Sequence, residues 1–468
     1  MQPRYSELVR GGNAGRSAVV GGGMILHALN TFIVATILPS VVRDIGGLRY
    51  FAWSTVLYVV GSLLGAAFSA RLLQRAGARR AYRLALPGFA LGSALCALAP
   101  AMPLLLFGRA VQGLAAGTLS ALSFTLVRSL FPQHLWPRAL SVVSIAWGVA
   151  TLLGPAVGGV FAQYGLWRVA FWSVAAAAPL LLLLVETALP RDLARPPLPR
   201  AALPVDNLAL LAVSVLAVSV GSMSAAPAAN AAGLAAALAA FALFCHREAT
   251  GRARLFPRTA TVPGAPLAAT YAAMTLLLAA TTPEIFVPYF LQTLHGLTPL
   301  HAGYFSALMA MGWTVGSVVA SGAAGARGVL AAGPTVLAAG LAGLALLMPH
   351  PGAPGPDLLG MAAALAAVGL GIGITWPHLG ARVFGFVAEA DRDLAGGSIT
   401  MVVMVGSAFG AAFGGMVTSL AGMTVPGGVP GAISASAWLF GAFLFAPLLA
   451  ALAIRRLPAL VRPAPAAE

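Results

Sequence analysis

The sequence predicts an all-α membrane protein in which two six-helix bundles are joined by two extra central helices. Three observations predict this architecture: the composition, the series of apolar stretches and the placement of the charges. Of the 468 residues, 59% are hydrophobic and only 8% are charged, whereas soluble domains carry about 25% charged residues. The mean hydropathy is +0.91. We therefore expect a polytopic protein whose spans cross a hydrocarbon layer of ~30 Å.

Fourteen apolar stretches are long enough, or nearly so, to cross this layer as helices. Helices are expected because lipid cannot satisfy free backbone polar groups. The predicted spans cover residues 17–42, 50–71, 82–100, 103–127, 138–163, 168–188, 205–225, 229–245, 265–291, 301–323, 329–348, 357–379, 395–422 and 431–454. The spans 205–225 and 229–245 are short and rich in alanine, and a count of twelve follows if these two only lie on the membrane surface.

The arginines indicate the orientation of the spans, and all 27 basic residues are arginine. With a cytoplasmic N-terminus, 23 of them fall in cytoplasmic segments and one, Arg109, lies within a span. The outer loops hold only Arg43, Arg49 and Arg168. This bias follows the positive-inside rule and predicts an even number of spans with both termini in the cytoplasm of a bacterium, in its inner (plasma) membrane. It also accounts for the net charge of +15 without nucleic acid as a partner.

Two polar stretches divide the chain. Residues 189–204 are rich in proline and arginine, and residues 246–264 contain HREATGRARLFPRT. The predicted organisation is a cytoplasmic tail (1–16), an N-terminal six-helix bundle (17–190), cytoplasmic linkers with two inserted helices (191–264), a C-terminal six-helix bundle (265–456) and a second cytoplasmic tail (457–468). Two six-helix halves are typical of a transporter whose halves tilt around a central site.

The fourth predicted span contains polar residues in the run LLLFGRAVQGLAAGTL. Arg109 and Gln112 are three residues apart and therefore share one face of a helix. An arginine within a span indicates a functional site because burying its charge is costly. Alternatively, Arg109 extends from the outer third of the helix to the lipid headgroups.

The fifth predicted span contains the run GVATLLGPAVGG. Four of its residues affect helix geometry, and these are Gly154, Pro155, Gly158 and Gly159. The proline removes a backbone donor and kinks the helix. The glycines permit close contact with a neighbouring helix.

These two runs, R-x-x-Q-G and G-x(5)-G-P-x-x-G-G in adjacent spans, resemble the major facilitator superfamily. The second run is similar to a motif of its drug:proton antiporters, and LNTFIVATILP and VPYFLQTLHGLTPLHAGYFSAL resemble the fourteen-helix branch of those antiporters. The resemblance covers about residues 20–420. It implies a major-facilitator-like fold and a monomeric secondary transporter that exports lipophilic or cationic small molecules in exchange for protons by alternating access.

The resemblance also pairs the fifth and tenth spans across the two halves. We therefore expect Gly154 and Gly158 to face the glycines at positions 312 and 316, so that smooth surfaces let the halves slide. Ordinary close packing of membrane helices is the alternative.

Two positions depart from the fourteen-helix branch. Asn30 stands where the first helix of that branch usually carries an aspartate. Gln74 stands at the acidic position of the loop ARLLQRAGARR, which retains Arg75, Gly77 and Arg79. The resemblance implies a conformational role for the three retained residues. Because the usual acids are missing, a proton-independent facilitator or importer of a small organic solute is an alternative function, and a lipid-handling membrane protein is another.

Glu284 is the deepest acidic residue, because the other eleven fall in loops, tails or the ends of spans. An unpaired buried carboxylate is costly, so Glu284 should face protein or water. By the resemblance, its helix is the counterpart of the first helix, where His27 and Asn30 are three residues apart. We expect Glu284, Arg109, His27, Asn30 and Gln112 to form the proton-coupling or substrate-binding site.

Two of these side chains have structural alternatives. Glu284 is alternatively an ion-pair partner of Arg109, and His27 is alternatively a neutral core histidine bonded to a backbone carbonyl. Pro283 and Pro288 should interrupt the helix that carries Glu284. Three further residues are expected to contact the cavity, and these are Tyr271, Tyr289 and Gln292.

An intramembrane enzyme is a further alternative. Only the segment Trp376-Pro377-His378 near a helix end suggests it, and no clustered nucleophile, base or metal ligand accompanies this segment in the sequence. No G-x(4)-G-K-[ST] run is present, so ATP is not expected to drive the protein. The two cysteines lack the spacing of a metal site. We therefore predict a transporter, not an enzyme, without metal or cofactor, whose partners are a small-molecule substrate, protons and membrane lipid.

Overall fold

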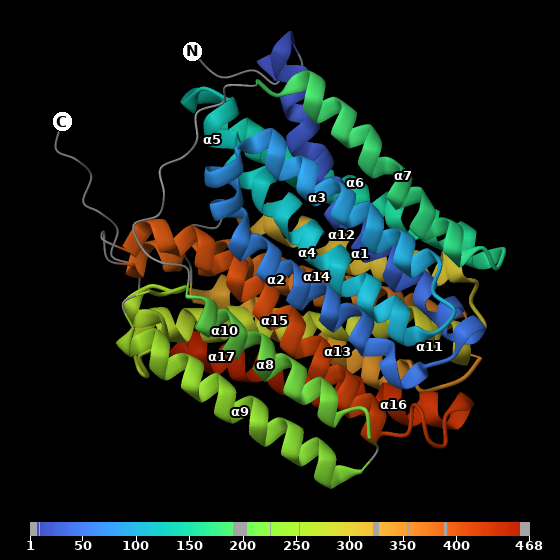
Figure 1. Cartoon of the computed structure of the whole chain (residues 1–468). Coiled ribbons are helices and arrows are strands. Elements are labelled where there is room, and N and C mark those ends of the chain that lie inside the picture. The colour runs from blue at the N-terminus through green and yellow to red at the C-terminus, as the bar shows by residue number, and fades with distance from the viewer. Residues whose placement is uncertain are drawn as a thin grey trace.

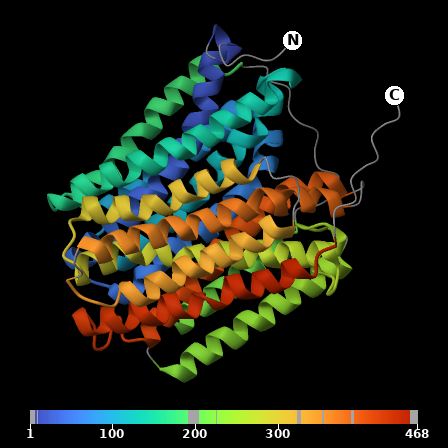
Figure 2. The same ribbon diagram turned by 180° about the vertical axis from the view of Figure 1, so that it is seen from behind.

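The structure is a computed structural model that describes residues 7–8, 10–190, 204–224, 226–251, 253–321, 327–352, 355–387 and 391–458. Long helices run side by side through the molecule (Figures 1 and 2). The elements before residue 190 are α1 (Gly12–Ile45), η2 (Leu48–Tyr50), α2 (Phe51–Ala76), α3 (Ala78–Ala97), α4 (Met102–Thr125), α5 (Val127–Leu130), η3 (Gln133–Leu135), α6 (Trp136–Gln163) and α7 (Trp167–Ala188).

The elements after residue 203 begin with a helical pair and continue with a second series of long helices. They are α8 (Val205–Gly221), α9 (Pro227–Thr250), η4 (Arg258–Thr261), α10 (Pro266–Thr281), η5 (Thr282–Phe286), α11 (Val287–Leu294), α12 (Pro299–Ser321), α13 (Arg327–Leu347), α14 (Gly355–Phe386), α15 (Arg392–Leu420), α16 (Gly428–Phe443) and α17 (Phe445–Arg455). Residues 191–203 of the predicted linker, residues 1–6 and 9 of the N-terminal tail and residues 459–468 of the C-terminal tail lie outside the described residues.

Twelve helical segments in the described ranges are long and apolar enough to cross a membrane. The predicted count of fourteen is therefore not confirmed. Two of the predicted spans fall outside the twelve. Helix α3 has 20 residues, but Arg79, Arg80 and Arg83 in its first two turns lower its hydropathy. Helix α8 is apolar but has only 17 residues. Helix α9, the other doubtful span, is among the twelve.

The helices pack as two groups that touch along two seams. In the first group, α1 packs against α4, α6 and α7, and α4 packs against α2 and α3. In the second group, α14 packs against α12 and α13, and α10 packs against α15 and α17. These two seams are formed by α6 against α12 and by α2 against α15, and α1 also contacts α11 and α12 of the second group. Figures 1 and 2 show the first group (blue to green) above the second (yellow to red).

The α8–α9 pair lies beside the α2–α15 seam. Helix α8 packs against α9, α2 and α15. The indole Nε1 of Trp53 in α2 donates a hydrogen bond to the Ser219 carbonyl of α8 at 3.1 Å. Val215 of α8 belongs to a buried apolar cluster with Val56 of α2 and Ala411 of α15. Helix α8 is therefore attached to both groups.

The glycine contact predicted between α6 and α12 is wrong, although these two helices do pack together. The prediction concerns Gly154, Gly158, Gly312 and Gly316. The two α6 glycines lie against the backbone of α1 at residues 32 and 33, whereas the two α12 glycines lie against the backbone of α14. Each residue turns a helix by about 100°, so packing decides which glycine stripe faces which neighbour.

The α6–α12 seam uses other residues of the same Gly-Pro run. A Cβ atom added to Gly159 would lie 2.5 Å from the Cα atom of Leu300 in α12. A Cβ atom added to Gly303 of α12 would lie 3.1 Å from the Cβ atom of Pro155. The two helices therefore approach closely where one of them carries only hydrogen as a side chain.

Candidate functional site

Glu284 lies where a membrane helix is interrupted. Helix α10 ends at Thr281, the 3-10 turn η5 follows, and α11 begins at Val287. The predicted interruption by Pro283 and Pro288 is confirmed, because both prolines lie within the first two positions of a new helical element. Proline lacks the N–H that would continue the α-helical bonding, and short 3-10 stretches inside helices often mark functional hinges.

The Glu284 side chain is half-buried and has no polar partner. It forms neither a hydrogen bond nor an ion pair with any residue that the structure describes. Its neighbours in η5 are fixed: the Thr282 hydroxyl donates to the Ala279 carbonyl at 2.7 Å, and the Phe286 ring stacks on Phe51 of α2 at 5.4 Å between centroids. The surroundings therefore hold the turn in place and leave the carboxylate available.

Arg109 of α4 is buried, with 2% of its surface exposed. Its Nε donates to the Ser54 carbonyl at 3.2 Å, and its Nη1 donates to Oε1 of Gln112. Its Cζ lies 4.0 Å from the centroid of the Tyr58 ring. A carbonyl, an amide and an aromatic face thus compensate the guanidinium charge. This burial excludes the alternative of an arginine that reaches the headgroups, and no ion pair joins Arg109 to Glu284 among the described residues.

Gln112 extends this network to α3. Its side chain is fully buried, and its Nε2 donates to the Ser93 hydroxyl at 2.7 Å. Ser93 in turn donates to the Phe89 carbonyl at 2.8 Å. The predicted shared face of Arg109 and Gln112 is confirmed by the bond between them.

His27 of α1 is joined to the arginine through Tyr58. The Tyr58 hydroxyl donates to the His27 carbonyl at 3.0 Å and lies 3.1 Å from His27 Nδ1. A phenol has one proton, so both bonds form together only when Nδ1 carries a proton and donates. The imidazole therefore bonds a side chain and not the backbone carbonyl of the alternative reading. The Trp147 ring lies 5.9 Å from the imidazole between centroids.

Asn30 is fully buried one helical turn beyond His27. Neither its Oδ1 nor its Nδ2 has a hydrogen-bond partner among the described residues, and the Ser54 hydroxyl is in the same situation. A buried polar group without a partner costs about 1–3 kcal/mol. Both side chains are fully buried, so neither is open to solvent in this structure.

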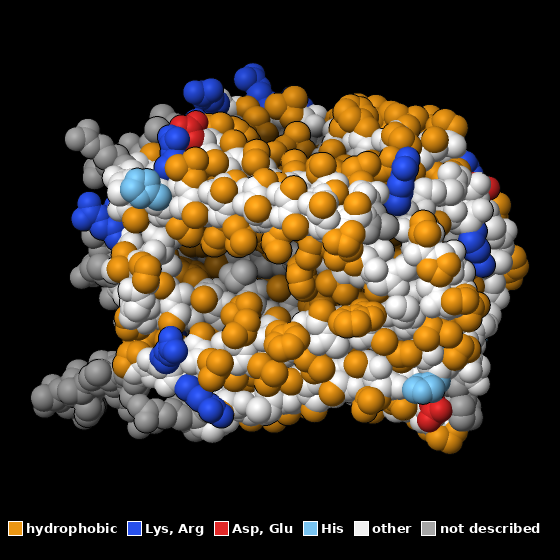
Figure 3. Space-filling view, turned by 90° about the horizontal axis from the view of Figure 1, so that it is seen from below, with side chains coloured by type: hydrophobic (Ala, Val, Ile, Leu, Met, Phe, Trp, Pro, Cys, Tyr) orange, Lys and Arg blue, Asp and Glu red, His pale blue; other side chains and the backbone are white. Residues whose placement is uncertain are grey.

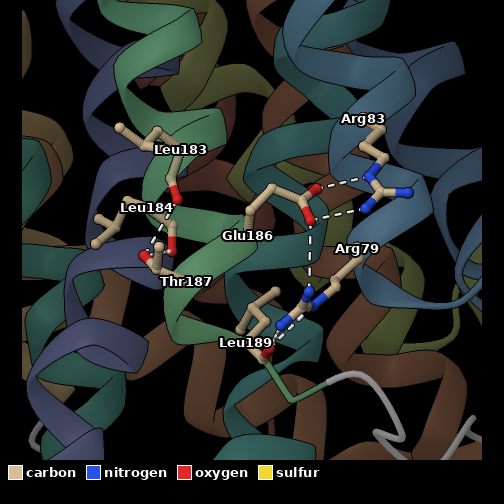
Figure 4. Close-up of polar contacts among 7 residues, drawn as sticks. All are labelled: Arg79, Arg83, Leu183, Leu184, Glu186, Thr187 and Leu189. Carbon is tan, nitrogen blue, oxygen red and sulfur yellow. Dashed lines mark hydrogen bonds and ion pairs between the residues drawn. The ribbon is translucent and has the colours of Figure 1, made fainter.

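The three retained residues of the loop between α2 and α3 lie at the ends of these helices. Arg75 is exposed in the last turn of α2, and Gly77 follows with φ of 78°. Figure 4 shows Arg79 and Arg83 of α3 around Glu186 of α7. Arg83 binds the carboxylate at 2.6 and 2.7 Å, and Arg79 Nη1 lies 3.4 Å from it. Arg79 therefore joins α3 to α7 within the first group.

The three predicted cavity contacts are not brought together. Tyr271 is hydrogen-bonded to the Ser398 hydroxyl and lines a cavity of about 930 Å³. Tyr289 is 9% exposed and lies among aromatic rings. Gln292 lies near the end of α11, where its Oε1 accepts a bond from Arg43 at 3.3 Å.

Sequence reasoning missed the two α2 residues of the network, Ser54 and Tyr58. They are four residues apart in the run STVLYVV and so share one face of the helix. A tyrosine and a serine on one face of an apolar span are a signal that could have found them.

The segment Trp376–His378 is engaged elsewhere: the ring of Trp376 contacts Trp313 at 5.8 Å, and His378 Nε2 lies 3.1 Å from the Ala320 carbonyl oxygen.

Comparisons with known proteins agree with this fold. The D-xylose-proton symporter has the same architecture, with a TM-score of 0.65 at 16% identity over 96% of this chain and 98% of that chain. A protein described as a probable multidrug-efflux transporter of Mycobacterium tuberculosis is 39% identical over 420 residues, which are 87% of this chain and 88% of the relative.

A second relative matches a shorter region. Multidrug resistance protein 3 of Bacillus subtilis is 31% identical over 150 residues, which are 32% of this chain and 29% of that protein. The family model of the Major Facilitator Superfamily matches residues 20–381. A match of this extent, together with the 39% identical relative, shows that the chain belongs to the major facilitator superfamily.

Proposed function

We propose that this protein is a secondary active transporter that exports lipophilic or cationic small molecules in exchange for protons. Membership of the superfamily supports transport, and the relative described as a multidrug-efflux transporter supports export. One observation carries the proton coupling: Glu284 is a half-buried carboxylate without a polar partner among the described residues, on an interrupted membrane helix. Such a carboxylate can take up a proton or bind a cation, and the two compete for it.

In this proposal the two groups of helices carry complementary charges. Arg109 supplies a fixed positive charge in the first group, held by Gln112 and Tyr58. Glu284 supplies a charge in the second group that disappears when a proton binds. Protonation from the outer side neutralises Glu284 and lets the empty carrier return. Loss of the proton to the cytoplasm restores a carboxylate that attracts the next cation, while His27 and Asn30 offer polar groups on the facing half.

The test is flux of ethidium, a lipophilic cation, in proteoliposomes with and without an imposed pH gradient. The gradient should stimulate flux by the wild-type protein, and Glu284→Gln should remove the stimulation because an amide cannot take up the proton. Asp206→Asn is the matched control, since this carboxylate is 71% exposed. Stimulation that survives in Glu284→Gln would show that another group couples the proton.

A facilitator that does not use protons is the second candidate. The observation that favours it is Asn30, a fully buried amide at the position where the resembling branch carries an acid. Wild-type flux that is indifferent to the pH gradient, and equal in Glu284→Gln, would select this candidate.

We also infer that α3 and α8 cross the membrane, which gives fourteen spans in a monomer with both termini on the cytoplasmic side of a bacterial plasma membrane. At 1.5 Å per residue, the 20 residues of α3 extend ~30 Å and the 17 residues of α8 extend ~25 Å. Both lengths suffice for a span. Cysteines introduced at positions 10 and 456 should react with an impermeant maleimide only in inside-out vesicles, whereas cysteines at position 101, between α3 and α4, and at position 226, between α8 and α9, should react in intact cells. Labelling of position 10 or 456 in intact cells, or no labelling of position 101 or 226 there, would overturn this topology.

A further inference from the structure

A large cavity separates α9 from the second group of helices. Helix α9 packs closely along α8 and touches η4, but most of its surface is exposed, including 61% of Leu238. The cavity of about 930 Å³ lies between α9 on one side and α10, α15 and α17 on the other. Figure 3 views the molecule from the α9 side and shows this face hollowed, with hydrophobic side chains around the hollow.

The cavity walls are apolar and aromatic. Phe241 of α9 meets Phe409 of α15 at 5.7 Å between ring centroids. Phe256, which follows α9, meets Tyr271 of α10 at 5.6 Å, and the Tyr271 hydroxyl is bonded to Ser398. The volume is within the range of small-molecule sites. Apolar and aromatic walls bind hydrocarbon chains. The open side of the cavity beside the exposed helix α9 gives such chains access to it.

An arginine with two unpartnered nitrogens follows α9, close along the chain to the cavity lining. Arg254 is in the turn after α9, two residues before Phe256, which lines the cavity. Its Nε and Nη1 are buried and lack a hydrogen-bond partner in the described part of the chain. The nearby Glu248 carboxylate is occupied, because it accepts bonds from the backbone N–H groups of Leu255 and Phe256 at 3.0 Å and from the Asn207 amide at 2.6 Å.

We infer that this cavity binds an anionic phospholipid of the surrounding bilayer, with an acyl chain between α9 and α10 and the phosphate on Arg254. A guanidinium nitrogen without an acceptor fits a phosphate oxygen, to which it donates a charge-assisted hydrogen bond. The same turn carries predicted cytoplasmic arginines, and the cytoplasmic leaflet is where anionic headgroups attract basic residues. The bound lipid fills the space between the α8–α9 pair and the second group. This inference does not rest on the proposed function.

The test is photo-crosslinking in nanodiscs. The full-length protein is placed in phosphatidylglycerol or phosphatidylcholine that carries a diazirine on one acyl chain, and the labelled peptides are identified by mass spectrometry. The label should concentrate on the α9 and α10 peptides and favour phosphatidylglycerol. Ala272→Trp, at an exposed position that lines the cavity, should remove most of this label. Ala176→Trp, in the separate groove between α3 and α7, is the matched control and should not.

The headgroup is tested separately. Arg254→Gln should lower the preference for phosphatidylglycerol about fivefold, the factor expected for one basic residue near an anionic surface. Arg80→Gln, an exposed arginine of α3, should leave the preference unchanged. Label that persists in Ala272→Trp overturns the acyl-chain site between α9 and α10. A wild-type protein that shows no headgroup preference overturns the role of Arg254. If the tryptophan variant does not fold, Ala272→Leu answers the same question.

Discussion

Replacing Gln112 by leucine should destabilise the protein because it removes one of the two hydrogen-bond acceptors of a buried charge. Gln112 accepts a bond from Arg109 and donates one to Ser93 at 2.7 Å. A bond to a charged group contributes about 1.5–3 kcal/mol, and a neutral bond about 0.5–1.5 kcal/mol. Gln112→Leu removes one of each kind. The expected loss in the free energy of unfolding is therefore about 2–4.5 kcal/mol.

The companion variants decide whether the charge causes this loss. Arg109→Leu combined with Gln112→Leu removes the guanidinium together with its acceptor, and replacing both members of a buried charged pair by apolar side chains is often close to neutral. The double variant should therefore be more stable than Gln112→Leu alone. Equilibrium unfolding of the purified proteins in mixed micelles gives the coupling energy as a double-mutant cycle. If the losses of the two single variants sum to the loss of the double variant within about 0.5 kcal/mol, the two side chains are independent and the prediction is wrong.

Two further predictions concern close contact and unpartnered groups. Gly159→Ala should lower the free energy of unfolding by about 1–3 kcal/mol and slow ethidium flux, because the new Cβ would lie 2.5 Å from the Cα of Leu300. Gly148→Ala on the same helix is the control, because its new Cβ would have nothing within 4 Å. Equal flux in both variants contradicts the close α6–α12 contact. Asn30→Leu should raise the midpoint of thermal unfolding, because it removes two buried polar atoms whose missing hydrogen bonds cost about 1–3 kcal/mol. A lower midpoint would show that the Asn30 amide has hydrogen-bond partners in the membrane.

The membrane helices could be predicted from the sequence because lipid leaves the chain few choices. Apolar runs must become helices, and the prolines at 283 and 288 mark the interruption before α11 as the structure has it. The number of spans is not fixed by the sequence where the charge or length of a helix is marginal. The arginines at the start of α3 lower its hydropathy, and the 17 residues of α8 are short for a span. Composition alone cannot separate such helices from surface helices.

The site could be predicted only within one helix. The spacing of Arg109 and Gln112 places them on one face, and they bond as expected. Their partners on α2, Ser54 and Tyr58, come from a different helix, and the rotation of that helix is set by packing. The same reason explains the wrong glycine contact. Spacing fixes which residues share a face, but not which neighbour that face meets.

The attachment of α8 has a consequence for movement. Helix α8, which belongs to neither group, is bonded to α2 through Trp53 and packed against α15 through Val215, so it bridges one seam. Across the α6–α12 seam, the described elements in contact are members of the two groups themselves, including α1 with α11 and α12. A change of shape that opens both seams equally would have to break this bridge. The α2–α15 side is therefore the stiffer one. The two groups should separate more readily on the α6–α12 side.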